Sequence, residues 1–311
     1  MTLRTAFIHA GLFVLTFVTL TFAGVQWLNK DPFELASFSL GLTYACLVIS
    51  FLGVHEMGHY IAAKIHGVDT TLPFFLPFPP FYGIMPFGTL GAVIRIRSEL
   101  RDRKTLFDVG AAGPISGFVV CIALLLWGMT HLPSIEYLYA IHPQYRSMAQ
   151  IPAEGLTFGK PLLYLLVEKY VAPPTAFVPP MNEVYHYPFL CVGWFGTLVT
   201  ALNLLPIGQL DGGHIAYAMF GSRSHLLAQV VLLVLLVLGT AGILPFLGIQ
   251  VSFGFVGWLF WSMIFALLLK SKRFRHPALE DIAAIGPMRE ALGWVCALIF
   301  ILSFTIVPVS Q

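Results

Sequence analysis

Long stretches without Asp, Glu, Lys or Arg alternate with short charged segments along the chain. A helix of about 20 apolar residues crosses a hydrocarbon core about 30 Å thick, and each uncharged stretch is at least that long. These stretches are residues 5–29, 35–55, 70–94, 109–135, 184–210, 224–269 and 291–311. The pattern predicts a protein that crosses a membrane several times.

Two of these stretches are unlike a single spanning helix. Residues 224–269 would form a helix of about 69 Å at about 1.5 Å per residue, more than twice the membrane thickness. We therefore expect them to fold back near residues 244–248 and supply two spans. Residues 70–94 contain five prolines, and a proline inside a helix costs about 3 kcal/mol. Their continuation, residues 88–97, alternates β-branched and basic residues, which predicts a short strand with one face in water.

The predicted fold is an all-α polytopic membrane protein, with a small membrane-associated β hairpin between its second and third helices. The seven expected transmembrane helices cover roughly residues 7–27, 38–64, 108–129, 188–207, 225–245, 250–269 and 291–308. Composition agrees, because 58% of the residues are hydrophobic and 10% are charged, whereas a soluble domain has about 25% charged residues. A single water-soluble globular domain is excluded.

The basic residues predict the orientation of these helices. With a cytoplasmic N-terminus, one side of the membrane holds thirteen of them: Arg4, Lys64, Arg95, Arg97, Arg101, Arg103, Lys104, Arg223, Lys270, Lys272, Arg273, Arg275 and Arg289. The other side holds Lys30, Arg146, Lys160 and Lys169. The positive-inside rule then predicts a multi-pass protein of the cell membrane, with the N-terminus inside and the C-terminus outside. The net charge of +2 mainly reflects cytoplasmic loops beside anionic lipid, so no nucleic-acid partner is implied.

Three polar residues at the end of the second predicted helix have the spacing of a metal site. His55 and His59 lie one turn apart on the same helix face, so both imidazoles can reach one zinc ion at about 2.0–2.1 Å. Glu56 lies beside them and can accept a proton from a zinc-bound water. Capping of the wet end of the helix is the alternative, but it explains one polar residue rather than three at ligand spacing.

A zinc ion with one open position needs a third protein ligand. Asp211 is the first acidic residue after the uncharged stretch 184–210, and it follows a proline and glycine break that can open the helix backbone. The sequence Asp-Gly-Gly is also common in ordinary turns. Spacing alone therefore leaves Asp211, His214 and Asp108 as alternatives.

Taken together, these motifs resemble the site-2 protease family of intramembrane zinc metalloproteases. The motif residues are His55-Glu56-Met57-Gly58-His59, Ala112-Gly113-Pro114, and Asn203 with Pro206, Leu210, Asp211 and Gly212. The resemblance covers roughly residues 40–220. It implies Zn²⁺ as the cofactor, His55, His59 and Asp211 as ligands, and Glu56 as general base. It also implies that Asn203 and Pro206 shape the site or hold the substrate backbone.

The resemblance further predicts one integral membrane metalloprotease domain over residues 1–311. We expect a catalytic core at about 38–220, an extracytoplasmic loop at about 131–187 and accessory helices at about 225–308. The segment between the second and third helices is too short for the PDZ domain that some members insert, and no C-terminal nucleotide-binding domain follows. A compact member of the family is therefore expected.

The expected reaction is hydrolysis of a peptide bond within or near the transmembrane segment of a membrane-anchored protein substrate. All peptide groups of a transmembrane helix are hydrogen-bonded internally, so the substrate must be unwound locally before water attacks. Residues 88–97 either pair with the unwound substrate by strand addition or form a hairpin that closes the site. With the zinc motif, this strand is expected toward the cytoplasmic side.

Two other functions remain open on the sequence. One is a catalytically inactive membrane adaptor that kept the fold, which the intact Glu56 argues against. The other is a metal-ion transporter, which would not need a glutamate directly after His55. The remaining histidines are predicted to be interfacial rather than metal ligands: His9, His66, His131, His142, His186, His225 and His276. The substrate and the oligomeric state are not specified by the sequence.

Overall fold

Apolar helices form most of the chain in the computed structural model, which describes residues 3–79, 87–98, 100, 102–249, 251, 253–270 and 284–310. Some residues used in the predictions above lie outside the described residues: Arg101, Lys272, Arg273, Arg275 and His276. The seven main helices are α1 (Leu3–Gln26), α2 (Leu42–Ile65), α3 (Arg103–Thr130), α6 (Pro188–Asn203), α8 (Ser224–Ala241), α9 (Gly257–Lys270) and α10 (Pro287–Ser303). Each overlaps one of the predicted ranges.

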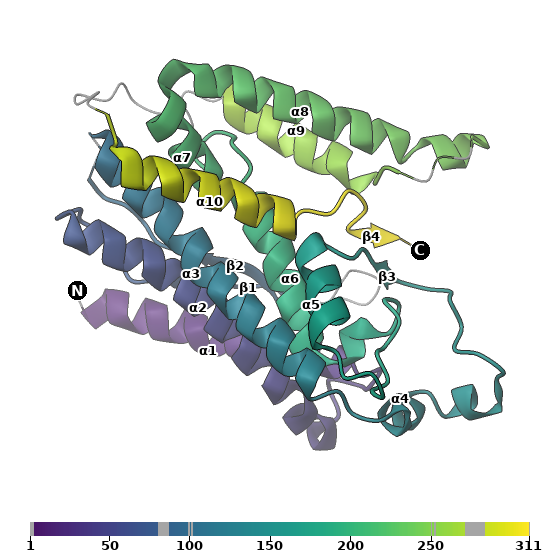
Figure 1. The fold of residues 1–311 in the computed structure, drawn as a ribbon. Helices are drawn as coiled ribbons and strands as arrows, with labels where there is room; N and C mark the ends of the chain where they lie inside the picture. The colour runs from purple at the N-terminus through teal and green to yellow at the C-terminus, as the bar shows by residue number, and fades with distance from the viewer. Residues whose placement is uncertain are drawn as a thin grey trace.

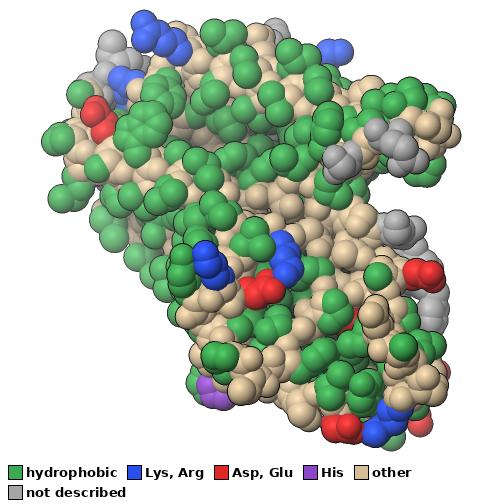
Figure 2. All heavy atoms as spheres, turned by 45° about the vertical axis from the view of Figure 1, so that its right-hand side comes forward, with side chains coloured by type: hydrophobic (Ala, Val, Ile, Leu, Met, Phe, Trp, Pro, Cys, Tyr) green, Lys and Arg blue, Asp and Glu red, His purple; other side chains and the backbone are tan. Residues whose placement is uncertain are grey.

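Four segments of the described residues are long and apolar enough to cross a membrane: Leu3–Gln26, Leu35–Ile65, Arg103–Thr130 and Asp211–Leu247. Helices α6 and α9 are shorter apolar helices. Hydrophobic side chains also cover much of the face shown in Figure 2, where charged side chains are few and scattered. The prediction of a mainly helical membrane protein is confirmed, whereas a count of seven spans is not established.

Several helix ends differ from the predicted boundaries for local reasons. Helix α9 begins at Gly257 rather than near residue 250, because Gly248 and Gly254 have φ angles of 79° and 116°, which no right-handed helix contains. Helix α6 ends at Asn203, ahead of Pro206, which has no backbone N–H to continue the helix. The predicted fold-back after α8 is present as the short 3₁₀ turn η5 (Leu244–Leu247).

Helix α3 lies at the centre of the bundle, in contact with α2, α6, α7 (Asp211–Phe220) and α10 (Figure 1). Small residues allow these close approaches: a Cβ atom on Gly110 would lie 2.8 Å from His214 of α7, and one on Gly58 would lie 2.6 Å from the Ala112 carbonyl oxygen. Helices α8 and α9 pack against each other along one side of the molecule (Figure 1). This arrangement brings α2, α3 and α7 together around one point.

The small β hairpin between α2 and α3 is present as predicted. Strand β1 (Phe74–Pro77) pairs antiparallel with β2 (Thr89–Val93), with Phe74 opposite Val93. Strand β1 packs along α1, and β2 lies beside α2. The described residues give β2 a strand neighbour on one side only.

The segment between α3 and α6 forms a separate end of the molecule, with short elements rather than a long helix. In order, these elements are α4 (Ile135–Ile141), η2 (Pro143–Ser147), β3 (Thr157–Phe158), α5 (Leu162–Val171) and η3 (Val184–His186). Helix α5 buries Leu163, Tyr164 and Val167. Strand β3 pairs with β4 (Val309–Ser310), so the C-terminal strand lies at this same end (Figure 1).

Candidate metal centre

Helix α2 supplies three buried polar side chains within little more than one turn. His55, Glu56 and His59 are 3%, 7% and 7% exposed. Because residues i and i+4 share a helix face, the Nε2 atoms of His55 and His59 lie 3.2 Å apart. Three polar side chains are thus buried together inside an apolar bundle, which is costly unless they have partners there.

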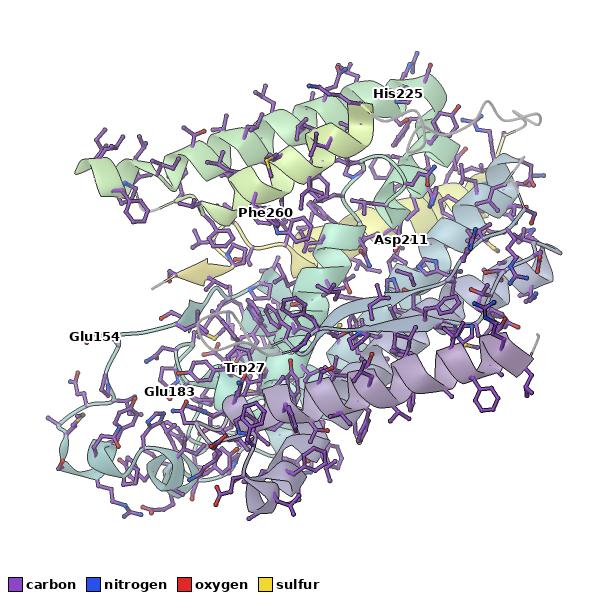
Figure 3. The ribbon with its side chains drawn as sticks, turned by 180° about the vertical axis from the view of Figure 1, so that it is seen from behind. Trp27, Glu154, Glu183, Asp211, His225 and Phe260 are labelled. Carbon is purple, nitrogen blue, oxygen red and sulfur yellow. The ribbon has the colours of Figure 1, made fainter. Side chains whose placement is uncertain are left out.

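Asp211 completes the group from the first residue of α7. The chain turns between α6 and α7, where Gly208 has a φ of 55°, a conformation that glycine adopts without strain. The turn places Asp211 Oδ2 3.4 Å from His55 Nε2 and Oδ1 3.3 Å from His59 Nε2. Figure 3 shows Asp211 among the helices of the bundle.

These three side chains fit a zinc ion. Four ligands held tetrahedrally at about 2.0–2.1 Å are separated from one another by about 3.3 Å, close to the separations of 3.2, 3.3 and 3.4 Å found here. One ligand atom from each of His55, His59 and Asp211 lies within 4.8 Å of the others. Three protein ligands leave one position open, as in catalytic zinc sites.

A backbone carbonyl sets the orientation of one ligand. The Val109 carbonyl oxygen lies 2.6 Å from His59 Nδ1, and a carbonyl can only accept, so Nδ1 carries the proton. The lone pair of His59 is then on Nε2, toward Asp211. This is the usual outer contact of a metal-binding histidine.

Glu56 lines the same cavity as His55, His59 and Asp211. The backbone N–H of Ile94, directly after β2, donates a hydrogen bond of 2.9 Å to Glu56 Oε2. A cavity of about 260 Å³ lies between the ligand group and β2. It is lined by His55, Glu56, His59, Ala92, Val93, Ile94, Ile96, Val109, Asn203, Gln209, Leu210, Asp211 and His214. There is room beside the carboxylate for water.

The other predicted site residues occupy different positions. Asn203, at the end of α6, has its amide 3.3 Å from His55 Nε2 and lines the cavity. Pro206 lies in the turn between α6 and α7 and lines an adjacent apolar cavity between α7, α8 and α10 instead. Asn203 thus lies next to the ligand group, whereas Pro206 lines a neighbouring cavity and not the one that holds the ligand group.

The two alternatives to Asp211 as third ligand, Asp108 and His214, do not join His55 and His59. Asp108 is 2.8 Å from His66 Nε2 and accepts two hydrogen bonds from Arg289, at 2.8 and 2.7 Å, so this carboxylate ties α3 to α10. His214 lines the cavity without joining the ligand group of His55, His59 and Asp211. Of the three alternatives, only Asp211 has its oxygens directed at both histidines.

Two groups around the site carry no signal in the sequence. The Ile94 N–H and the Val109 carbonyl belong to the backbone, which every residue except proline supplies in full. Their use here depends on where β2 and α3 pass α2. Sequence reasoning could not have found them from residue types.

A sequence model of peptidase family M50 matches residues 43–244. The chain belongs to peptidase family M50. The match spans all of α2 from Thr43 onward and continues beyond Asp211. It confirms the resemblance to the site-2 protease family that the motifs indicated.

Curated relatives of this M50 chain come from plants. It is 27% identical over 274 residues to "Probable zinc metalloprotease EGY1, chloroplastic" of Arabidopsis thaliana, covering 87% of this chain and 43% of that protein. It is 30% identical over 221 residues to "Probable zinc metalloprotease EGY2, chloroplastic" of Oryza sativa subsp. indica, covering 70% and 37%. It is 31% identical over 274 residues to "Probable zinc metallopeptidase EGY3, chloroplastic" of Arabidopsis thaliana, covering 82% and 41%. The M50 chain therefore spans less than half the length of these relatives.

Proposed function

We propose that this chain is an intramembrane zinc metalloprotease that hydrolyses a peptide bond within or near the transmembrane segment of a membrane-anchored protein. The observation that carries the proposal is the buried carboxylate of Glu56 beside the donor group of His55, His59 and Asp211, inside a bundle of apolar helices. The relatives' names as probable zinc metalloproteases support the same activity.

The proposed chemistry divides between the metal and this chain's own residues. His55, His59 and Asp211 would hold zinc, which as a Lewis acid would make water more acidic and polarise a carbonyl group. Glu56 accepts the proton of the attacking water and then gives it to the leaving amine. The Ile94 N–H, hydrogen-bonded to Oε2, holds the carboxylate in place and leaves Oε1 for this proton transfer.

We further propose that β2 holds the substrate in an extended form. An apolar cavity of about 370 Å³ runs beside Thr89, Leu90 and Gly91 of β2 and is closed on its other sides by α6 and α9. Asn203 and Leu210 line both this cavity and the polar one, so the two are adjacent. A peptide added to the free side of β2 would pass from apolar surroundings to Glu56.

In this proposal, Asn203 and Pro206 have different tasks. The Asn203 amide, near His55, can donate to the carbonyl of the scissile bond. Pro206 ends α6 and sets the turn that carries Asp211 into the site. In this proposal, Pro206 therefore positions Asp211, the third ligand, and shapes the side of the site next to the turn.

We also propose the arrangement in the membrane. Seven crossings by α1, α2, α3, α6, α8, α9 and α10 put the N-terminus in the cytoplasm, the C-terminus outside, and the site toward the cytoplasmic face of the cell membrane. The core is then residues 38–220, with 131–187 outside and 225–308 as accessory helices. The pairing of β3 with β4 supports this, since it joins the 131–187 segment to the C-terminus on one side.

The test is cleavage of a single-span membrane protein by the purified chain in lipid. Glu56→Gln is expected to abolish cleavage and keep bound zinc, because it removes the proton acceptor and leaves the three ligands. Glu154→Gln, the same change at an exposed position far from Asp211 (Figure 3), is the control with normal cleavage. Wild-type rates in Glu56→Gln would refute the proposal.

Two results would favour the other functions. Zinc uptake into vesicles that survived Glu56→Gln would favour a transporter, and zinc binding without cleavage in wild type would favour an adaptor.

A further inference from the structure

A second group of metal-binding side chains lies far from the first, at the end of the molecule built from residues 131–187. His142 follows α4, and Glu183 and His186 flank or end the short turn η3. Glu183 and His186 are 2% and 0% exposed, and the His142 side chain is 13% exposed. Figure 3 shows Glu183 close to Trp27 and well away from Asp211.

The three side chains converge on one point. His142 Nε2 lies 2.9 Å from His186 Nε2, and Glu183 Oε2 lies 3.6 and 3.3 Å from these two nitrogens. These separations bracket the distance of about 3.3 Å between ligands of a tetrahedral zinc ion. They are close to the separations of 3.2, 3.3 and 3.4 Å in the His55, His59 and Asp211 group.

Outer contacts orient two of these side chains for metal binding. His186 Nδ1 donates its proton to the Trp27 carbonyl, which leaves the lone pair on Nε2. Tyr145 donates a hydrogen bond of 2.9 Å to Glu183 Oε1. Oε2 is buried without a hydrogen-bond partner in the described part of the chain, and it faces the two imidazoles. A buried carboxylate oxygen is costly in that state unless a cation is beside it.

A fourth position lies toward the surface. The amide of Asn29 is 3.2 Å from His142 Nε2, and its nitrogen and oxygen exchange places when the amide group turns over. Its oxygen can therefore serve as a fourth donor or hold a water there. The partial exposure of His142 gives an ion a route into the group.

We propose that His142, Glu183 and His186 bind a second zinc ion, which fastens the 131–187 segment to the end of α1. Two imidazoles and one carboxylate are a zinc donor set, whereas Mg²⁺ and Ca²⁺ require oxygen ligands. The ion would join three pieces of chain that are distant in sequence: the residues after α1, the end of α4, and η3. Because η3 leads directly into α6, the ion would also fix the start of the helix that ends at Asn203.

Zinc content per chain tests this proposal directly, using the full chain purified in detergent. His142→Ala and the double variant His55→Ala/His59→Ala are each expected to hold half of the zinc of the wild type, and the triple variant none. His131→Ala removes an exposed histidine from the same end of the molecule and is expected to keep the full amount. Zinc in His142→Ala equal to wild type, or no zinc in His55→Ala/His59→Ala, would overturn the proposal.

A thermal measurement separates zinc loss from misfolding. In the His55→Ala/His59→Ala background, added Zn²⁺ is expected to raise Tm by several degrees and added Mg²⁺ to leave it unchanged, because only zinc suits these donors. Adding Glu183→Gln, which keeps the side-chain shape, is expected to abolish the rise. A rise of equal size in that variant would show that zinc acts elsewhere and would refute the assignment.

Discussion

Gly113 of α3 lies against the imidazole of His59. A Cβ atom at this position would lie 2.1 Å from His59 Nε2, and one at Gly117 would lie 2.9 Å from His55 Nδ1. Such distances are below any van der Waals contact, so either the helix or the imidazole would have to move. The glycines that let α3 approach α2 thus also make room for the two histidines.

Gly113→Ala is therefore expected to displace His59 and weaken zinc binding about 10–100-fold, the range seen when contacts that orient metal ligands are lost. Cleavage should fall with it. The measurement is zinc affinity by competition with a chelator. Gly11→Ala is the matched control, because no atom lies within 4 Å of a Cβ placed there. Unchanged zinc affinity in Gly113→Ala would mean that the imidazole is not held between the two helices.

At the scale of elements, polar contacts anchor the first part of α3. Asp102 caps the helix by accepting a hydrogen bond of 2.8 Å from the Thr105 backbone N–H. Nearly two turns later, Asp108 joins His66 after α2 to Arg289 of α10. These contacts fix where α3 begins, and hence which of its residues face α2.

Acid is expected to weaken the Asp102 cap. Burial alone would raise the pKa of Asp102, but hydrogen bonds from Thr105 outweigh it and lower the pKa. A lowered pKa means that the stabilisation is fully present above the ordinary carboxyl pKa of about 3.9 and is lost as pH falls through the lowered value. Asp102→Ala should cost about 1 kcal/mol at neutral pH.

The comparison with Asp102→Asn checks this effect, because asparagine also caps helices but does not titrate. Thermal unfolding from neutral to acidic pH should show the Asp102→Ala penalty shrinking in acid relative to wild type. The Asp102→Asn protein should keep its cap throughout. A penalty for Asp102→Ala that stayed constant with pH would contradict the role assigned to the carboxylate.

At the scale of the whole molecule, the two groups of potential metal ligands lie at different ends of the bundle. The first lies among α2, α3 and α7, and the second lies where residues 131–187 meet the end of α1. The C-terminal strand β4 joins the second end through β3. The orientation of the chain in the membrane therefore determines which side of the membrane each ligand group lies on.

Labelling of single cysteines from outside the cell tests the proposed orientation. Lys169→Cys, outside in the proposal, should react with a membrane-impermeant maleimide in intact cells, whereas Lys104→Cys should react only after permeabilisation. Both lysines are exposed, so access to the reagent depends on the side of the membrane. The background is Cys46→Ser, because Cys46 is exposed and Cys121, Cys191 and Cys296 are buried. The reverse labelling pattern would invert the assignment.

The sequence by itself determined the apolar helices, the hairpin and the placement of His55, Glu56 and His59 on one turn, because these follow from local pattern and helix periodicity. The roles of these residues, and of Asn203 and Pro206, remain predictions. Spacing left Asp211 and Asp108 as alternatives, and the family resemblance implied Asp211. The tertiary structure shows that Asp211 faces the histidines, whereas Asp108 is held by Arg289. Only it brought His142, Glu183 and His186 together. Contacts between residues many turns apart depend on how the helices pack, and the spacing of residues along the chain does not encode that packing.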